Sequence, residues 1–174
     1  DGEIDIVEGD ITDFEAVRAA MDGQTYVCHA AALVPGSGAS CSECERVNVG
    51  GTKVACEAAL ETGVSRFLYI STAHVFGLDS GSSVNEESKP SMPAHPGYDE
   101  SKVRAEALVR NSAVKSLDSV IVNPTTAFGP GSRHSGRLIN LFLRNRLPVI
   151  PIPNRELSLV YSGDVARGAR LALE

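Results

Sequence analysis

The chain has 174 residues, of which 43% are hydrophobic, enough to form the core of one ordinary domain. With 16 Lys and Arg against 22 Asp and Glu, its formal net charge of -6 leaves no excess of cations to neutralise a phosphate backbone. We therefore expect a small-molecule partner and no nucleic acid. No apolar run reaches the roughly 18 residues that span a bilayer, and no signal-peptide pattern is present, so we expect no membrane span and a cytoplasmic location.

Short apolar or β-branched runs alternate with longer segments of helical period, which is typical of βα units around a parallel sheet. The predicted strands are Ile4–Val7, Tyr26–His29, Arg66–Ile70, Ser119–Val122 and Pro148–Pro151. The predicted helices are Asp13–Met21, Val47–Glu61, Tyr98–Asn111, Leu138–Arg144 and Asp164–Glu174. Asp13 is a suitable N-cap for the first helix, and Gly63 ends the second. The fold class that follows is α/β.

Two long stretches interrupt this alternation, Leu33–Cys44 and Leu78–Gly97. The first is rich in Gly, Ser and Cys, and the second in Ser, Pro and acidic residues, so neither is expected to be regular. Each follows the end of a predicted strand, and ligands of open α/β sheets bind outside those carboxyl ends. Long loops in compact domains are often functional, so we expect both to border a site.

The chain has four cysteines. Cys41 and Cys44 have the spacing of half a metal site or of a redox pair, but no second pair of comparable spacing completes it. Cys28 and Cys56 lie singly in apolar segments and are expected to be core residues. We therefore predict no metal site, with a loop pair and two core cysteines, and metal or redox use is the less favoured alternative.

Tyr98 and Lys102 are four residues apart, so both side chains rise from one face of the predicted helix. A phenol is a poor base at neutral pH because its ordinary pKa is about 10, but a nearby ammonium stabilises the phenolate. The pair therefore suits proton transfer, although Tyr and Lys at this spacing are also common on helix surfaces.

Ser71 and Thr72 directly follow the predicted strand Arg66–Ile70. A hydroxyl at this strand end can hydrogen-bond a substrate carbonyl or carbinol oxygen and hold it beside the tyrosine oxygen. The alternative is that both residues only cap or turn the chain.

Together these segments resemble the extended short-chain dehydrogenase/reductases, a family that includes NAD-dependent epimerases and dehydratases, dihydroflavonol reductases and 3β-hydroxysteroid dehydrogenases. Six motifs occur in that family's order and spacing, and they are Gly9–Asp13, His29–Ala32, Asn48–Thr52, Ser71–Gly77, Tyr98–Lys102 and Asn123–Gly131. Any one of them is weak evidence, whereas their coincidence is specific. The resemblance implies a Rossmann-type doubly wound parallel sheet, with NAD or NADP as cofactor.

The resemblance implies roles for individual residues. Thr72 matches the catalytic Ser/Thr, Tyr98 the general acid/base, and Lys102 the residue that lowers the tyrosine pKa and binds the nicotinamide ribose. The implied cofactor-binding residues are Asp10, Ile11, Ala30, Ala31, Ala32, Asn48, Ile70, Tyr98, Lys102 and Pro124. Asp10 and Ile11 match the pair at the adenine, and the alanines match a small-residue turn against which the dinucleotide lies.

Three further residues are candidates for substrate contact: His74, Asn123 and Arg155. A guanidinium binds anionic oxygens bidentately, so Arg155 suits a pyrophosphate, although a solvated surface arginine is an equal alternative. The family's 4,6-dehydratases carry Thr-Asp-Glu after the strand, where this chain has Thr72 followed by Ala73 and His74. The sequence therefore argues against dehydration.

The family's glycine-rich turn after the first strand is absent, so we expect a chain that lacks the first strand–helix–strand of the sheet and its pyrophosphate site. On this interpretation residues 1–174 are a fragment of one NAD(P)-binding domain, with a small substrate lobe starting at about residue 124. The lost segment would also carry the residue that distinguishes NAD from NADP.

The leading hypothesis is an NAD(P)-dependent oxidoreductase or epimerase that transfers a hydride to or from a secondary alcohol or ketone carbon. The expected substrates are a sugar nucleotide or a flavonoid-like or steroid-like ketone or alcohol. The alternative is a non-catalytic dinucleotide-sensing or scaffold protein of the same fold. The resemblance also implies a homodimer through two helices rich in small residues, unless those residues face the sheet, and they are Ala55, Ala58, Ala59 and Ala105.

Overall fold

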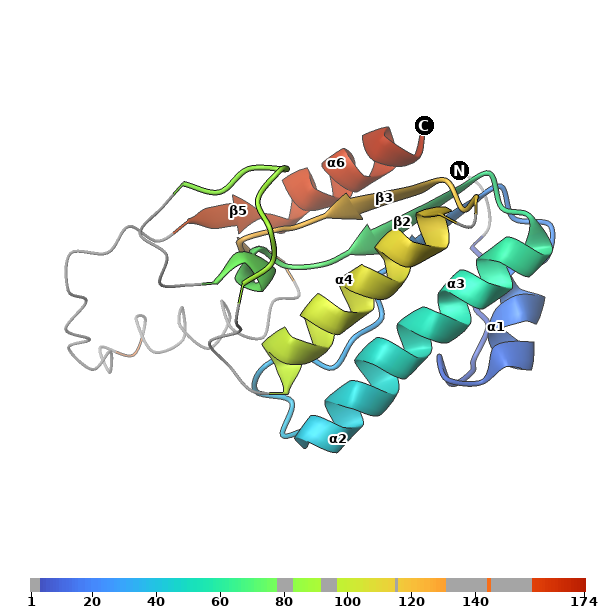
Figure 1. Ribbon diagram of the computed structural model, residues 1–174, viewed down its shortest axis with the longest axis horizontal. Coiled ribbons are helices and arrows are strands. Elements are labelled where there is room, and N and C mark those ends of the chain that lie inside the picture. The colour runs from blue at the N-terminus through green and yellow to red at the C-terminus, as the bar shows by residue number, and fades with distance from the viewer. Residues whose placement is uncertain (1–3, 78–82, 92–96, 115, 131–143, 145–157) are drawn as a thin grey trace. The chain divides into compact units, whose positions relative to one another are not determined.

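The computed structural model describes residues 4–77, 83–91, 97–114, 116–130, 144 and 158–174 (Figure 1). The chain divides into two compact units, residues 1–123 with Leu173 and residues 124–172 with Glu174. No helix in the described part of the chain is long and apolar enough to cross a membrane.

The first unit contains a parallel sheet of three strands in the order β1 (Tyr26–His29), β2 (Arg66–Ile70) and β3 (Ser119–Val122). All three have the bounds that the sequence predicts. The central strand β2 buries Phe67, Leu68 and Tyr69 in succession. Such a continuous apolar run is typical of a parallel strand whose two faces are both covered. The α/β class is therefore confirmed.

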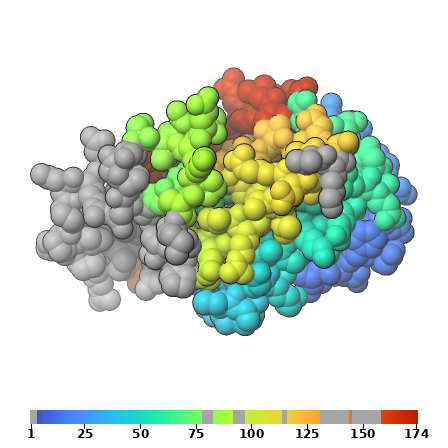
Figure 2. Space-filling model, in the orientation of Figure 1, coloured from blue at the N-terminus to red at the C-terminus, as the bar shows by residue number. Residues whose placement is uncertain are grey.

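Three helices lie side by side against this sheet: α1 (Phe14–Met21), α3 (Gly51–Thr62) and α4 (Tyr98–Val114) (Figure 1). In Figure 2 the side chains of α3 and α4 form one continuous surface. The Asp13 carboxylate caps α1 by accepting hydrogen bonds from the backbone of Glu15 and Ala16, as predicted. Gly63 ends α3 in the left-handed conformation, with φ at 68°.

The four alanines considered for a dimer face are fully buried in the core of this chain, and they are Ala55, Ala58, Ala59 and Ala105. They pack between the helices and the sheet, so the alternative interpretation, that these residues face the sheet, is correct. They offer no surface to a second subunit.

The second predicted helix begins earlier than expected. Helical backbone starts with α2 (Cys41–Cys44), continues as a π-helix over Glu45–Gly50 and enters α3. Ser40 and Glu43 form a capping box, which is the sequence signal for this start. The prediction that Leu33–Cys44 is irregular is therefore wrong for its last four residues, whereas residues 83–91 of the second loop contain no helix or strand.

The predicted strand Ile4–Val7 and the predicted burial of Cys28 are both wrong. Residues 4–10 form no strand, and Ile4 and Ile6 are each 88% exposed. The physical reason is that a strand needs a hydrogen-bonded neighbour, and no described strand pairs with this segment. Cys28 is exposed on β1 instead of lying in the core, whereas Cys44 and Cys56 are buried.

The second unit contains a two-stranded parallel sheet of β4 (Thr126–Phe128) and β5 (Leu159–Tyr161), followed by α6 (Ser162–Leu173). Neither strand was predicted from the sequence, because three residues are too few to show a period. The helix begins two residues before its predicted start. The predicted strand Pro148–Pro151 and all but the last residue of the predicted helix Leu138–Arg144 lie outside the described residues.

Candidate active site

The three residues predicted to be catalytic stand at the end of β2 and the start of α4. Thr72 follows β2, and its hydroxyl accepts a hydrogen bond from the His74 backbone at 3.3 Å, which caps the short 3₁₀-helix Ala73–Phe76. Tyr98 is the first residue of α4, and Lys102 lies one turn further on. Thr72 is 8% and Lys102 is 2% exposed, so the site is formed by buried polar groups.

Burial is the main influence on the Tyr98 phenol. Burial and the neighbouring Asp99 carboxylate raise the pKa of Tyr98 to about 12, and a hydrogen bond with the Thr72 side chain acts in the opposite direction. At neutral pH Tyr98 is a protonated phenol, and this form can donate a proton.

Lys102 is held by backbone and ring contacts from β2. Its ammonium donates a hydrogen bond to the Ile70 carbonyl at 2.7 Å and lies 4.2 Å from the centroid of the Tyr69 ring. Burial lowers the pKa of Lys102 to about 8, while the Glu106 carboxylate favours its charged form. Ile70 thus contributes its backbone carbonyl, which anchors the lysine.

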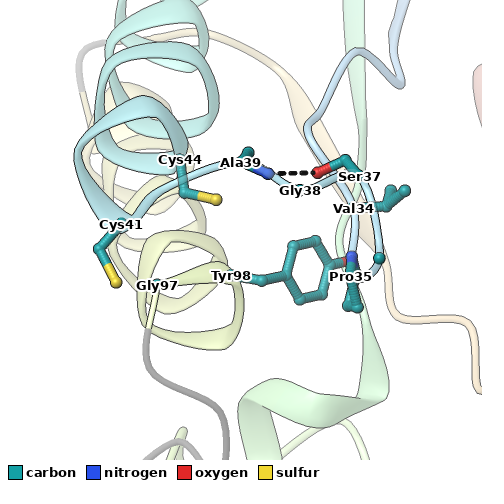
Figure 3. Close-up of a pocket in the computed structure, with 10 residues that line it drawn as sticks. Val34, Pro35, Ser37, Gly38, Ala39, Cys41, Cys44, Gly97 and Tyr98 are labelled. Atoms are coloured by element: carbon teal, nitrogen blue, oxygen red, sulfur yellow. Dashed lines mark hydrogen bonds between the residues drawn. The ribbon is translucent and has the colours of Figure 1, made fainter.

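A pocket of about 150 Å³ opens beside Tyr98. It is lined by residues 34–39, Cys41, Cys44, Gly97 and Tyr98. Figure 3 shows the Tyr98 ring reaching from α4 toward Pro35 and Ser37, with the two cysteines of α2 along one side. Gly36 and Gly38, in this loop, have φ angles near 80°, a conformation that favours glycine. The loop predicted to border a site therefore does lie next to the candidate acid/base.

Asn48 joins this loop to α4. Its side-chain oxygen accepts from the Leu33 backbone N–H at 2.7 Å, and its nitrogen donates to the Leu33 carbonyl at 3.1 Å and to the Ser101 hydroxyl at 2.9 Å. Ser101 in turn donates to the Tyr98 carbonyl at 2.7 Å. Asn48 is 1% exposed, so its contacts are with the protein itself.

The residues that the family resemblance assigns to the adenine and to the small-residue turn along the dinucleotide lie around the carboxyl end of β1 and the start of α1. Ala30 and Ala31 are exposed directly after β1, and their methyl groups leave the backbone open to a close ligand. The Asp10 carboxylate accepts two hydrogen bonds from Thr12, which lower the pKa of Asp10. Ile11 packs on α3, where a Cβ added at Gly51 would lie 2.9 Å from its Cγ2. The open alanine surface and the buried lysine fit a bound nicotinamide dinucleotide.

The structure gives the candidate substrate residues different surroundings. The His74 ring nitrogen Nδ1 lies 3.1 Å from a carboxylate oxygen of Asp99, which is fully buried. The Asn123 amide nitrogen donates to the Thr72 carbonyl at 3.2 Å and to Glu106 at 2.9 Å, so its donors serve the protein. Arg155 lies outside the described residues, and Pro124 begins the second unit.

Two buried acidic residues beside the site were missed by the sequence analysis, Asp99 and Glu106. Both have 0% exposure. The available signal was spacing, because Glu106 is four residues after Lys102 and shares its helix face. Among the described residues, no group of three or more His, Cys, Asp and Glu side chains could hold a metal ion.

The sequence pattern of the NAD dependent epimerase/dehydratase family matches residues 1–174. A putative dihydroflavonol 4-reductase of Synechocystis is 32% identical over 174 residues, which cover 97% of this chain and 50% of the relative. A 3β-hydroxysteroid dehydrogenase/Δ5→4-isomerase of Mycobacterium tuberculosis is 31% identical over 139 residues, covering 75% of this chain and 38% of the relative.

Among solved structures, the dTDP-glucose 4,6-dehydratase DesIV of Streptomyces venezuelae, crystallised with NAD, aligns with a TM-score of 0.81 at 28% identity. The alignment covers 95% of this chain and 53% of that one, so the chain spans about half the length of the proteins it matches, or less. The likeness confirms the Rossmann-type fold and NAD as the family's cofactor. The chain therefore belongs to the NAD-dependent epimerase/dehydratase family of extended short-chain dehydrogenases/reductases.

Proposed function

We propose that the protein transfers a hydride between a nicotinamide cofactor and a secondary alcohol or ketone carbon of a small molecule. The observation that carries this proposal is the placement of Thr72 at the end of β2 and of Tyr98 and Lys102 on the first turns of α4, with Tyr98 lining a pocket. A hydroxyl and a phenol placed beside one pocket can both reach one substrate oxygen.

When bound, the nicotinamide supplies the hydride for reduction or accepts it in oxidation. In reduction, Tyr98 donates its proton to the substrate oxygen as the carbonyl carbon gains the hydride, and an alcohol forms. Thr72 holds that oxygen through its hydroxyl. Because the pKa of Tyr98 is raised to about 12, its proton is in place at neutral pH.

Oxidation needs the opposite state of Tyr98. The phenol must lose its proton to accept one from the alcohol, and positive charge nearby makes this easier. Lys102 is still largely protonated at neutral pH because its pKa is about 8. Its ammonium contacts the Ile70 carbonyl and the Tyr69 ring of β2, and the residue lies one turn of α4 from Tyr98. Epimerisation would combine the two directions through a transient ketone.

We infer that the substrate is a ketone or alcohol of the dihydroflavonol or steroid type, or a sugar nucleotide. The dihydroflavonol-reductase relative supports the first type. A solved structure of the fold in complex with UDP-glucose and NAD supports the second. The replacement of the dehydratase carboxylates by Ala73 and His74 argues against dehydration.

The test is Tyr98→Phe in the protein as it occurs naturally, assayed by absorbance of NADH and NADPH with a dihydroflavonol, a 3-ketosteroid and UDP-glucose. Loss of the proton donor should lower kcat by about 10² to 10⁴-fold, while cofactor affinity changes less than about threefold. Tyr26→Phe is the matched control, because Tyr26 is 47% exposed on β1. Undiminished turnover in Tyr98→Phe would exclude the proposed acid/base, and bound cofactor without redox change in the unmodified protein would favour a dinucleotide-sensing role.

A further inference from the structure

Glu106 has one of the most completely buried and most fully bonded carboxylates among the described residues. One oxygen, Oε2, accepts hydrogen bonds from the Ser71 hydroxyl at 2.7 Å and the Asn123 amide at 2.9 Å. The other, Oε1, accepts from the Arg110 guanidinium at 2.7 and 3.2 Å. Burying a carboxylate costs free energy unless its oxygens accept hydrogen bonds or pair with a cation, so these contacts allow Glu106 to be buried here.

The Glu106 carboxylate links α4 to two strand ends. Ser71 follows β2 and Asn123 follows β3, and both strands end at the site. The same Asn123 nitrogen also donates to the Thr72 carbonyl at 3.2 Å. The backbone of Thr72 is therefore connected to Glu106 through a single side chain, and the Ser71 hydroxyl fixes the preceding residue.

Glu106 is also an opposite charge one turn from Lys102 on the same face of α4. The groups that face Lys102 are His29 from β1, Tyr69 from β2 and Glu106 from α4. Burial lowers the pKa values of Lys102 and His29. Burial also raises the pKa of the Tyr69 phenol, so Tyr69 stays neutral. Of the three, Glu106 alone favours the lysine's charged form through an opposite charge.

We propose that Glu106 is a positioning residue for the hydride transfer proposed above. Through Ser71 and Asn123 it holds Thr72 in place, and it sets a negative charge one turn from Lys102 on the same face of α4. This inference rests on the proposed function for its catalytic consequence. Its electrostatic part concerns Lys102 alone and is measurable without turnover.

The experiment compares Glu106→Gln with Glu100→Gln on the same helix. Glu100 pairs with Arg104 at 3.0 Å on the surface, where both side chains are about half exposed, so it receives the identical chemical change away from the site. We measure kcat and KM with the carbonyl substrate of highest turnover, and the Lys102 titration from its ¹³Cε chemical shift by NMR.

For Glu106→Gln we expect kcat to fall about 10 to 100-fold with a cofactor KM within threefold, because orientation and not binding is lost. The pKa of Lys102 should fall by about one unit, as expected on removing a close opposite charge. Glu100→Gln should change neither. Glu106→Asp keeps the charge but shortens the reach, so kcat should fall while the Lys102 titration stays near that of the unmodified protein.

A Glu106→Gln variant with unchanged kcat and an unchanged Lys102 titration would overturn the proposal. If Glu106→Gln does not fold, Glu106→Asp decides the positioning part: a lower kcat supports it and an unchanged kcat overturns it. If the unmodified protein shows no turnover, the proposed function fails, and the Lys102 titration in Glu106→Gln still decides the electrostatic role of Glu106.

Discussion

The imidazole of His29 stacks on the phenol ring of Tyr69, with 5.5 Å between the ring centroids and 27° between the ring planes. His29 Nε2 also lies 3.0 Å from the Thr52 hydroxyl. Both residues are buried, so this pair forms a polar layer between β1, β2 and α3 beneath Lys102. The pair determines how the stability of the fold responds to acid.

We predict that His29 makes the protein less stable as the pH falls from about 6.5 to about 4. Burial, aided by the Lys102 charge, lowers the pKa of His29 to about 4, so the unfolded chain takes up a proton before the folded one does. The folded state keeps its full stability above pH 6.5 and loses about 3 kcal/mol by pH 4, with no further loss from this residue below that. Urea denaturation at a series of pH values measures it.

The control for this prediction is His29→Gln, which retains a hydrogen-bonding side chain toward Thr52 and does not titrate. Its stability should decline less across the same pH interval. Equal declines in the variant and the unmodified protein would show that other groups cause the acid sensitivity.

Asn48→Ala should destabilise the fold by about 3 kcal/mol, because it leaves the Leu33 backbone groups and the Ser101 hydroxyl without their buried partner. Thermal and urea unfolding measure the change. Asn85→Ala, at an exposed turn, is the matched substitution and should alter stability by less than about 0.5 kcal/mol. A cost near zero for Asn48→Ala would contradict the bracing role assigned to this residue.

Gly51→Ala and Gly168→Ala should have opposite effects, although both add one methyl group to a helix. A Cβ at residue 51 would lie 2.9 Å from Ile11 Cγ2, whereas nothing lies within 4 Å of one at residue 168. We expect Gly51→Ala to destabilise by about 1 to 3 kcal/mol through overpacking, and Gly168→Ala to stabilise by about 0.5 to 1 kcal/mol through helix propensity.

Ile11→Ala in the Gly51→Ala background tests the cause, since it removes the atoms that the new methyl group meets. The double-mutant cycle should then show coupling of about 1 kcal/mol or more. Purely additive effects would mean that Gly51 is constrained by something other than Ile11.

The cysteines should differ in reactivity toward maleimide. Cys41 is exposed, whereas Cys44 and Cys56 are buried and burial raises the pKa of both thiols. Peptide mapping by mass spectrometry should therefore find Cys41 modified before the two buried residues. Because Cys41 lines the pocket beside Tyr98, its modification should also lower turnover, and a Cys41→Ser variant should resist this effect. Faster labelling of Cys44 than of Cys41 would contradict the pocket as described.

Local patterns predicted much of the fold. β1, β2 and β3 have the predicted bounds because each is a short run of apolar or β-branched residues with clear ends, although only β2 is buried along its length. Asp13 and Gly63 act as the helix signals that their residue types indicate. The proposed catalytic residues were also singled out, since Tyr98 and Lys102 are one helical turn apart, Thr72 directly follows a strand, and the family resemblance assigns roles to all three.

Other features depend on neighbours distant in the chain. Ile4–Val7 has the composition of a strand, but a strand exists only with a hydrogen-bonded partner, and none of the described strands pairs with it. Cys28 lies in an apolar segment yet is exposed on β1. Whether such a residue is buried depends on what packs beside the strand.

The sequence by itself determined the α/β class and the three strands of the first sheet, because each rests on periodicity within a few residues, and its family resemblance singled out Thr72, Tyr98 and Lys102 as the predicted catalytic set. Only the tertiary structure decided that Glu106 is a buried carboxylate shared by Ser71, Asn123 and Arg110, and that Asn48 serves the protein through Leu33 and Ser101. The physical reason is that these contacts, apart from the one between Glu106 and Arg110 within α4, join residues 15 to 53 positions apart, and a hydrogen bond forms only where folding brings donor and acceptor within about 3 Å.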